Sequence, residues 1–185
     1  MAFFLASTDH FTMFFILIST FLAITDGKFS EQYPETKATK HDDKIYHLHF
    51  YFHDIVSGKN PTAILVAGHR NSFGSTAMID DPLTEGPDPS SKLVGRAQGM
   101  YAMTSQHDGS LLMVLNFAFN EGKFNGSSVS VLGRNPVLDA VREMPVVGGS
   151  GIFRFAHGYA LAKTYQYNIT SGDAVVEYNV FVMHH

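Results

Sequence analysis

The chain has 185 residues, 45% of them hydrophobic, which allows a single domain with a sizeable core. A formal net charge of -4 with only 13 lysines and arginines excludes the basic surface that nucleic-acid binding requires. The moderate charge content also argues against a disordered chain and against a protein with several membrane spans.

The N-terminal residues 1–27 predict a secretory signal peptide. Residues 11–24 form an uncharged apolar run, too short for a bilayer-spanning helix of about 20 residues. Thr25 and Gly27 follow at the spacing that a signal peptidase needs, so cleavage is expected directly after Gly27. A buried core helix is the alternative, because the region before the run offers no lysine or arginine.

Residues 28–44 are polar and contain Pro34, so they predict a flexible N-terminal arm. Alternation of apolar and polar side chains starts at Ile45, and it predicts a strand. Its two faces are Tyr46, Leu48, Phe50 and Phe52 on one side and His47, His49, Tyr51 and His53 on the other. The three histidines could be metal ligands, but an exposed polar face explains them more simply, and no metal site is predicted.

Seven further strands are predicted over residues 62–68, 73–79, 93–104, 111–119, 126–132, 152–167 and 174–183. Turn signals separate most of them, including Asp81-Pro82 and Gly148-Gly149. No segment of the mature chain shows a clean helical period. Eight strands joined by short turns indicate an antiparallel sheet that closes on itself or packs as a sandwich.

We expect an eight-stranded antiparallel β-barrel over residues 45–185, because the long apolar last strand would otherwise be an exposed edge. Several glycines lie inside strand-like stretches, where a glycine often marks the bend or bulge that closure needs. They are Gly74, Gly95, Gly99, Gly133 and Gly158.

Two features beside the signal peptide fit a secretory route. The triplets that begin at Asn125 and Asn168 are N-glycosylation sequons, each next to a predicted turn. The chain has no cysteine, so a secreted form must obtain its stability from its core and from oligomerisation rather than from disulfides.

Three residues could carry chemistry on local grounds. Asp54 follows an aromatic strand face, where a carboxylate can accept a proton or hold a phenol, although it could equally cap the next turn. Tyr101 lies on the strand face opposite Arg96, which could itself pair with a surface carboxylate. Arg142 offers a rigid charged fork for an oxyanion, or a surface ion pair with Asp139 or Glu143.

Three motifs in order resemble the plant dirigent proteins, and the resemblance runs from about Ile45 to the C-terminus. They are Phe50-Tyr51-Phe52-His53-Asp54, the run from Leu93 to Tyr101 (LVGRAQGMY), and the run VVGGSGIF that begins at Val146. The resemblance implies that Asp54 is an acid facing the barrel interior, that Tyr101 supplies an aromatic hydroxyl there, and that Arg142 is the arginine of the family's TRD motif.

The chain departs from lignan-forming dirigent proteins at two points. Those proteins have a second acid seven residues before the arginine, where this chain has Asn135, and they have a cysteine pair that is missing here. An amide cannot act as general acid or base, so Asp139 is the candidate substitute, and both residues are candidates for substrate binding. The resemblance implies an acidic pair or Asp-Gly near the cavity rim at Asp80-Asp81, whereas the local sequence predicts a turn there.

The resemblance implies a protein of the apoplast that binds phenylpropanoid-type aromatics, uses no cofactor and forms homo-oligomers, either dimers or trimers. A separate laccase or peroxidase makes phenoxy radicals, and the protein directs their coupling by stabilising a quinone methide. Two alternatives stay open, a pterocarpan synthase-like dehydratase acting on an isoflavanol and a binding protein of the cell wall without turnover. No phosphate-binding loop or hydrolase motif is found.

Overall fold

The computed structural model describes residues 44–184, so the predicted signal peptide and nearly all of the predicted arm lie outside the described residues. The described chain forms strands and two 3-10 helices. They are β1 (Lys44–Asp54), β2 (Ala63–Ala67), β3 (Thr76–Thr84), β4 (Leu93–Met103), β5 (Ser110–Phe119), η1 (Gly122–Phe124), β6 (Ser128–Pro136), β7 (Arg142–Ser150), η2 (Gly151–Phe153), β8 (His157–Tyr167) and β9 (Ala174–His184). Between residues 44 and 184, no helix has the length and apolar character to cross a membrane.

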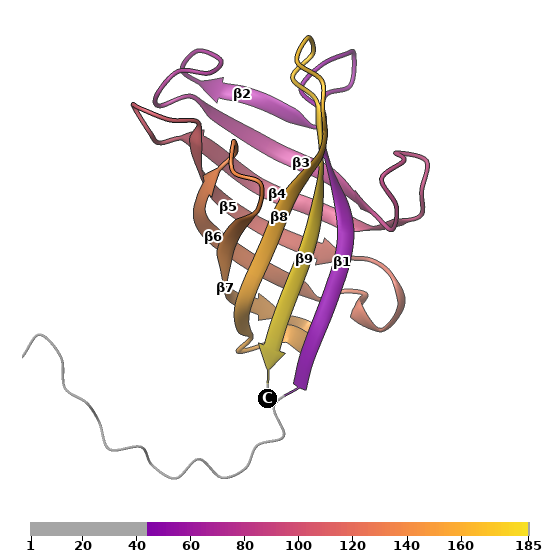
Figure 1. The fold of residues 1–185 in the computed structure, drawn as a ribbon. Coiled ribbons are helices and arrows are strands. Elements are labelled where there is room, and N and C mark those ends of the chain that lie inside the picture. Colours follow the sequence, from indigo (N-terminus) through magenta and orange to yellow (C-terminus); the bar gives the residue numbers. More distant parts are fainter. Residues whose placement is uncertain (1–43, 185) are drawn as a thin grey trace, which may run out of the picture. The chain divides into compact units, whose positions relative to one another are not determined.

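The strands form one closed antiparallel ring (Figure 1). Neighbours follow the order β1-β9-β8-β7-β6-β5-β4-β3, and β3 pairs back to β1. The short β2 stays outside this ring and pairs only with β3. The ring therefore has eight strands, and the predicted all-β, eight-stranded antiparallel barrel is confirmed. Closure leaves the ring strands without a free edge.

The set of ring strands differs from the predicted set at two points. The predicted strand over residues 62–68 is β2, which lies outside the ring, and the eighth ring strand is β7, which the sequence did not predict. The predicted turn at Gly148-Gly149 is part of β7. Gly149 is needed there because a Cβ would lie 2.6 Å from the carbonyl oxygen of Ser128 on the paired strand.

The predicted turn at Asp81-Pro82 is also wrong, because β3 runs through it to Thr84. Up to Asp80 the backbone of β3 bonds to β2 and its preceding loop, and from Leu83 onward it pairs with β1. Pro82 lies between these two ladders, where its missing N–H costs no ladder hydrogen bond on that side. The turn signal therefore marks a change of partner within a continuous strand.

Aromatic side chains fill the end of the barrel where β1 begins and β9 ends. Phe50, Phe117 and Tyr178 pack at the centre, with ring centroids 5.0 Å apart for the first pair and 5.2 Å apart for the second. Phe124 and Phe153 stack below them, with centroids 5.4 Å apart. Removal of one such buried ring typically costs about 3–5 kcal/mol of stability. The inward-facing polar residues lie at the opposite end, where β1 ends and β9 begins, and we call this the polar end.

Candidate functional site

Asp54 and Tyr101 meet at the polar end of the barrel. Asp54 is the last residue of β1, and strand alternation directs it to the same inward side as the buried Leu48, Phe50 and Phe52. Tyr101 lies on β4, where Ala97 and Gly99 on the same face are too small to block it. The Tyr101 hydroxyl donates to the Asp54 carboxylate, with 3.3 Å to Oδ2.

Burial makes both groups harder to ionise. Burial raises the pKa of Asp54 to about 6, the nearby carboxylate of Asp173 adds to the rise, and the Tyr101 hydroxyl and Arg70 act against it. Burial, together with the charge of Asp54, raises the pKa of Tyr101. Asp54 can therefore change its protonation state close to neutral pH, whereas Tyr101 remains a hydrogen-bond donor. Such perturbed groups are frequent in functional sites.

Arg142 is the first residue of β7 and is buried at the same end of the barrel. Its Nε donates to Asn135 Oδ1 and its Nη1 donates to Thr164 Oγ1, each at 3.0 Å. Burial lowers its pKa, although a guanidinium remains charged at any physiological pH. Within residues 44–184 no carboxylate forms an ion pair with Arg142. Its guanidinium is therefore held in place by neutral hydrogen-bond partners, and the charge of Asp139 acts on it without forming an ion pair.

Tyr178 connects the two groups of residues. It is an inward-facing, fully buried residue of β9, and burial raises its pKa. The charges of Arg142 and Asp54 both act on its hydroxyl, in opposite directions, and so does the carboxyl of Asp81. The three predicted residues Asp54, Tyr101 and Arg142 are therefore parts of one electrostatic neighbourhood in which Tyr178 lies.

Asp81 is a fourth ionisable residue of this neighbourhood, although the local sequence predicted a turn at Asp80-Asp81 and only the family resemblance implied an acidic pair here. It is fully buried on β3, and its Oδ1 accepts a short hydrogen bond from the Thr62 hydroxyl. Burial, followed by the charge of Asp54, raises its pKa to about 8. The sequence signal for its burial is the alternation that puts Ala77, Ile79, Asp81 and Leu83 on one strand face. The Asp81-Pro82 dipeptide predicted a turn instead, so the predicted strand ended before Asp81.

The two predicted substrate-binding residues lie in different settings. Asn135 is buried on β6, and its amide oxygen binds Arg142, so its observed role is to hold the guanidinium. Asp139 is exposed in the turn between β6 and β7, where its backbone N–H donates to the carbonyl of Pro136 at 2.9 Å. Its charge acts on Arg142, but the hydrogen bonds of Arg142 go to Asn135 and Thr164 and not to Asp139.

Arg96 faces outward, opposite to Tyr101 on the same strand. Its Nε donates to Asp80 Oδ1 at 2.6 Å, and Gln98 donates to the same oxygen at 3.0 Å. The alternative of a surface ion pair for Arg96 is therefore the observed one. Asp80 and Asp81 are adjacent in sequence but lie on opposite sides of the barrel wall.

The histidines of β1 have ordinary structural partners. His47 bonds to Asn179 at 2.8 Å, and His49 bonds to Glu177 at 2.9 Å, both on β9. His53 is not part of an exposed face as predicted, because it is buried and bonds to Thr84 at 2.7 Å. Across the described residues, no group of three or more His, Asp or Glu side chains is arranged to hold a metal ion.

Both predicted glycosylation sites are exposed. Asn125 follows η1, and Asn168 lies in the loop between β8 and β9. The side-chain oxygen of Asn168 accepts from the backbone N–H of Thr170 at 2.9 Å, while its amide nitrogen stays available.

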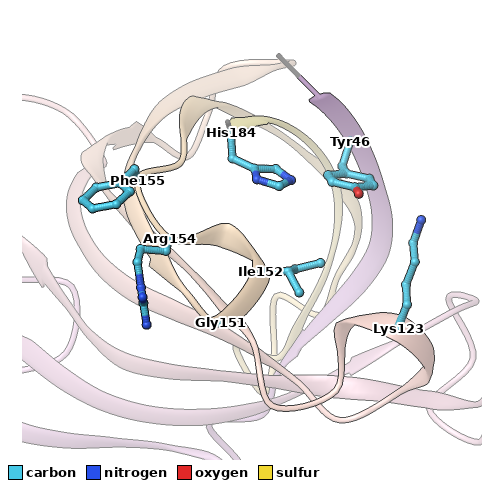
Figure 2. Close-up of a pocket in the computed structure, with 7 residues that line it drawn as sticks. All are labelled: Tyr46, Lys123, Gly151, Ile152, Arg154, Phe155 and His184. Carbon is cyan, nitrogen blue, oxygen red and sulfur yellow. The ribbon is translucent and has the colours of Figure 1, made fainter. Parts of the chain in front are cut away.

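A hollow of about 600 Å³ lies at the other end of the barrel, where β1 begins and β9 ends (Figure 2). It is lined by Tyr46, Lys123, Gly151, Ile152, Arg154, Phe155 and His184. The His184 ring stacks on Tyr46, with centroids 5.3 Å apart, and Lys123 Nζ lies 4.7 Å from the Tyr46 ring centroid. Seven residues of β1 lie between Tyr46 and Asp54, so this hollow is separate from the acids and Arg142.

Comparison with known proteins gives consistent matches over the barrel. The family model described as Dirigent-like protein matches residues 45–183. Dirigent protein 21 of Arabidopsis thaliana is 58% identical over 148 residues, which cover 77% of this chain and 78% of that protein. Pterocarpan synthase 1 of Glycine max is 50% identical over 151 residues, which cover 78% of this chain and 81% of that protein.

A solved structure agrees with the sequence matches. The pterocarpan synthase dirigent protein GePTS1 is 51% identical and superposes with a TM-score of 0.75, covering 77% of this chain and 86% of that chain. The match of the family model exceeds half of the chain, and the two relatives are at least 50% identical over more than two thirds of it. On this evidence the chain belongs to the dirigent family.

Proposed function

We propose that this chain holds a phenolic quinone methide at the polar end of its barrel and directs the stereochemistry of its reaction. The observation that carries the proposal is that the Asp54–Tyr101 pair and a buried Arg142 with neutral hydrogen-bond partners lie at one end of the barrel, where the charges of Asp54 and Arg142 both act on buried Tyr178. When a nucleophile adds to a quinone methide, the carbonyl oxygen becomes a phenolate. A fixed guanidinium or a phenol donor stabilises that charge, and a carboxylate takes the proton from the attacking hydroxyl.

In the main form of the proposal, the quinone methide arises from phenoxy radicals of a coniferyl alcohol-type phenol. A separate laccase or peroxidase supplies the radicals, and this chain performs no oxidation itself. Its contribution is orientation, so that coupling gives one stereoisomer, together with proton transfer in the ring closure that follows. The high identity to proteins named dirigent supports this form.

The second candidate is a dehydratase that closes an isoflavanol ring, and two observations favour it. The two matched structures named pterocarpan synthase are 51% and 50% identical to this chain. In addition, a carboxyl whose pKa is raised to about 6 can carry the proton that a leaving hydroxyl needs. In this reaction the C–O bond breaks, water leaves, and the second phenol hydroxyl adds to the quinone methide and returns a proton to the carboxylate.

One assay separates the two forms. The purified protein is incubated with an isoflavanol without oxidant, and with coniferyl alcohol in the presence and absence of laccase, and products are resolved by chiral chromatography. Stereoselective coupling only with laccase supports the main form, and dehydration without oxidant supports the second. Tight aryl binding with racemic or no product in every assay would leave a binding protein and reject both forms.

We also propose that the mature protein begins near Lys28, is secreted to the apoplast, carries glycans on Asn125 or Asn168 and forms a dimer or trimer. The predicted signal peptide and the exposure of both asparagines support this. Terminal sequencing and glycosidase treatment of plant-expressed protein, followed by light scattering, test these points. An intact Met1 on the mature protein would reject secretion by this route.

A further inference from the structure

Asp81 has a feature that the proposed function does not use. Its side chain is fully buried, and only Oδ1 has a hydrogen-bond partner, the hydroxyl of Thr62. Oδ2 is buried as well and has no partner among the residues that the structure describes. An unsatisfied buried carboxylate oxygen costs stability, so a neutral, protonated carboxyl is the form that this position favours.

Asp81 lies opposite Asp54 where the barrel closes. The pairs between β1 and β3 are Tyr51 with Thr84 and Phe52 with Leu83, in antiparallel register. The same register, continued by two residues along each strand, brings Asp54 opposite Asp81. Both side chains face inward, because both follow the alternation of their own strand.

The other charged and titratable groups that act on the two carboxyls come from several elements. On the inner side, Asp81 interacts with Asp54 from β1, Thr62 from the loop before β2, Tyr101 from β4 and Tyr178 from β9. The charges of Asp80 and Arg96 act on it from the outer side of the barrel wall. Asp54 faces Tyr101, Asp173 from the β8–β9 loop and Arg70 from the β2–β3 loop. The only cations in this set are Arg96, which is bound to Asp80, and Arg70. Neither forms an ion pair with Asp81 among the described residues.

We propose that Asp81 is the second acid of this site, a positioning residue that holds a proton behind Asp54 and resupplies it. The inference rests on the proposed function for the reaction that uses the proton. It also gives this chain two carboxyls although Asn135 occupies the position of the lignan-type second acid. The second carboxyl comes from β3 rather than from β6.

The proton balance is the same in either form of the reaction. Asp54 gives its proton to the oxygen of the reacting phenolic intermediate or to a leaving hydroxyl, and it becomes a carboxylate. Asp81 then transfers its proton to Asp54 and is itself ionised. The attacking hydroxyl loses a proton when it bonds to the methide carbon, and that proton returns to the pair. The pair ends each cycle with the number of protons with which it began.

The first test needs no substrate. In protein labelled with ¹³C at the aspartate carboxyls, we expect Asp81 to titrate near pH 8 and Asp54 near pH 6. In Asp54→Asn the Asp81 midpoint should fall, because the neighbouring negative charge that disfavours its ionisation is gone. Asp81→Asn assigns the resonance. A wild-type Asp81 midpoint below pH 5, or a midpoint that Asp54→Asn does not move, overturns the proposal.

The second test is the pH profile of kcat/KM, or of product enantiomeric excess if only coupling is observed. The activity of the wild type should fall near pH 8 on the basic side, where the Asp54–Asp81 pair loses its last proton. In Asp81→Asn only Asp54 can hold a proton, so the activity should already fall near pH 6. Asp108→Asn is the matched control, because Asp108 is exposed and pairs with Arg134, and the basic limb of its pH profile should match that of the wild type. A uniform loss in Asp81→Asn at every pH would indicate a structural role and reject the proposal.

The two tests distinguish failure of this inference from failure of the proposed function. If the carboxyls titrate as a coupled pair but neither substrate class is turned over, the proposed function fails and the assignment of the pair stands. If turnover is found but Asp81 is ionised at pH 5, the function stands and the assignment fails. Folding of each variant is checked by its amide NMR spectrum.

Discussion

Arg142 is the residue whose geometry most limits what can replace it. Its planar group reaches Asn135 and Thr164 at once, and both distances are 3.0 Å. A lysine keeps the charge but not the rigid fork. We therefore expect Arg142→Lys to fold normally and to lose about a hundred- to a thousand-fold in turnover, or most of its stereoselectivity, the usual scale for one lost oxyanion donor.

The measurement is the kcat/KM or the enantiomeric excess of Arg142→Lys beside that of Arg96→Lys. Arg96 is the matched control because it lies on the outer surface in an ion pair with Asp80. Near-wild-type values for Arg142→Lys would remove the oxyanion role. Equal losses in the two variants would point instead to a general effect on the barrel.

Asp54 and Asp139 differ in the contribution that we expect them to make to the reaction. Asp54→Asn should abolish the reaction with every substrate, because it removes the carboxyl that Tyr101 contacts. Asp139→Asn should have little effect, because Asp139 is exposed in a turn. Chiral product analysis of both variants tests this. If Asp139→Asn is as damaging as Asp54→Asn, then Asp139 serves as the second acid after all, and the turn must close over the barrel end.

The sequence predicted which residues could react but not which of them meet. Asp54, Tyr101 and Arg142 could be named from strand alternation and from the family motifs. The contact between Tyr101 and Asp54 could not, because it joins β1 and β4 across an intervening strand. Tyr178 resembled an ordinary core residue of an apolar strand, and no local pattern indicates that three charges act on its hydroxyl.

At the level of strands, glycine replaces side chains where neighbouring backbones approach closely. Gly99 on β4 has a φ of 153°, and a Cβ there would lie 2.0 Å from the carbonyl oxygen of Val114 on β5. Gly158 on β8 meets the carbonyl of Phe181 in the same way, at 2.0 Å. The pairing register is regular at both glycines, so they allow a close approach of backbones and do not mark the bulges that were predicted for strand glycines. Gly74, by contrast, lies in the loop before β3.

Gly99→Ala should therefore destabilise the barrel. An added methyl group must displace the backbone of β5, and overpacking of this kind usually costs about 1–3 kcal/mol. Urea denaturation compared with wild type measures the loss. Gly148→Ala is the control, because nothing lies within 4 Å of a Cβ at Gly148 and its stability should be nearly unchanged. A Gly99→Ala variant as stable as Gly148→Ala would contradict the close approach.

Strand boundaries were predicted less well than the presence of strands. The periodic, aromatic segments of β1, β5 and β9 have clear signals, whereas β7 contains a proline and two glycines and resembles a loop. Its order comes from pairing with β6 and β8 on either side. A local pattern cannot record such pairing, because the partners are distant in sequence.

For the whole molecule, the buried acids predict how stability depends on pH. The pKa of Asp81 is about 8 in the folded state, against an ordinary value of 3.8. Between these values the unfolded chain releases a proton that the folded chain keeps, so stability falls as pH rises and levels off above pH 8. Asp54 likewise lowers the stability as pH rises, and its effect levels off near pH 6. Buried His53, whose pKa is lowered, acts in the opposite sense below pH 6.5.

The window from pH 6.5 to 8 isolates Asp81. Across it the urea midpoint of the wild type should decrease, while that of Asp81→Asn should change less and exceed the wild-type value at pH 8. The measurement is a set of urea titrations at half-unit pH intervals for both proteins. Parallel curves for the two proteins would mean that Asp81 ionises with an ordinary pKa.

The two strand pairings of β1 that close the barrel differ in length, and we call each of them a seam. β1 is joined to β9 by eleven residue pairs but to β3 by two. The first separation under thermal fluctuation is thus expected between β1 and β3, a local opening far less costly than global unfolding. Asp54 and Asp81 lie just past the last pair of that short seam. Water would therefore reach the two carboxyls through the weakest point of the wall, and amide hydrogen exchange should be fastest there among the ring strands.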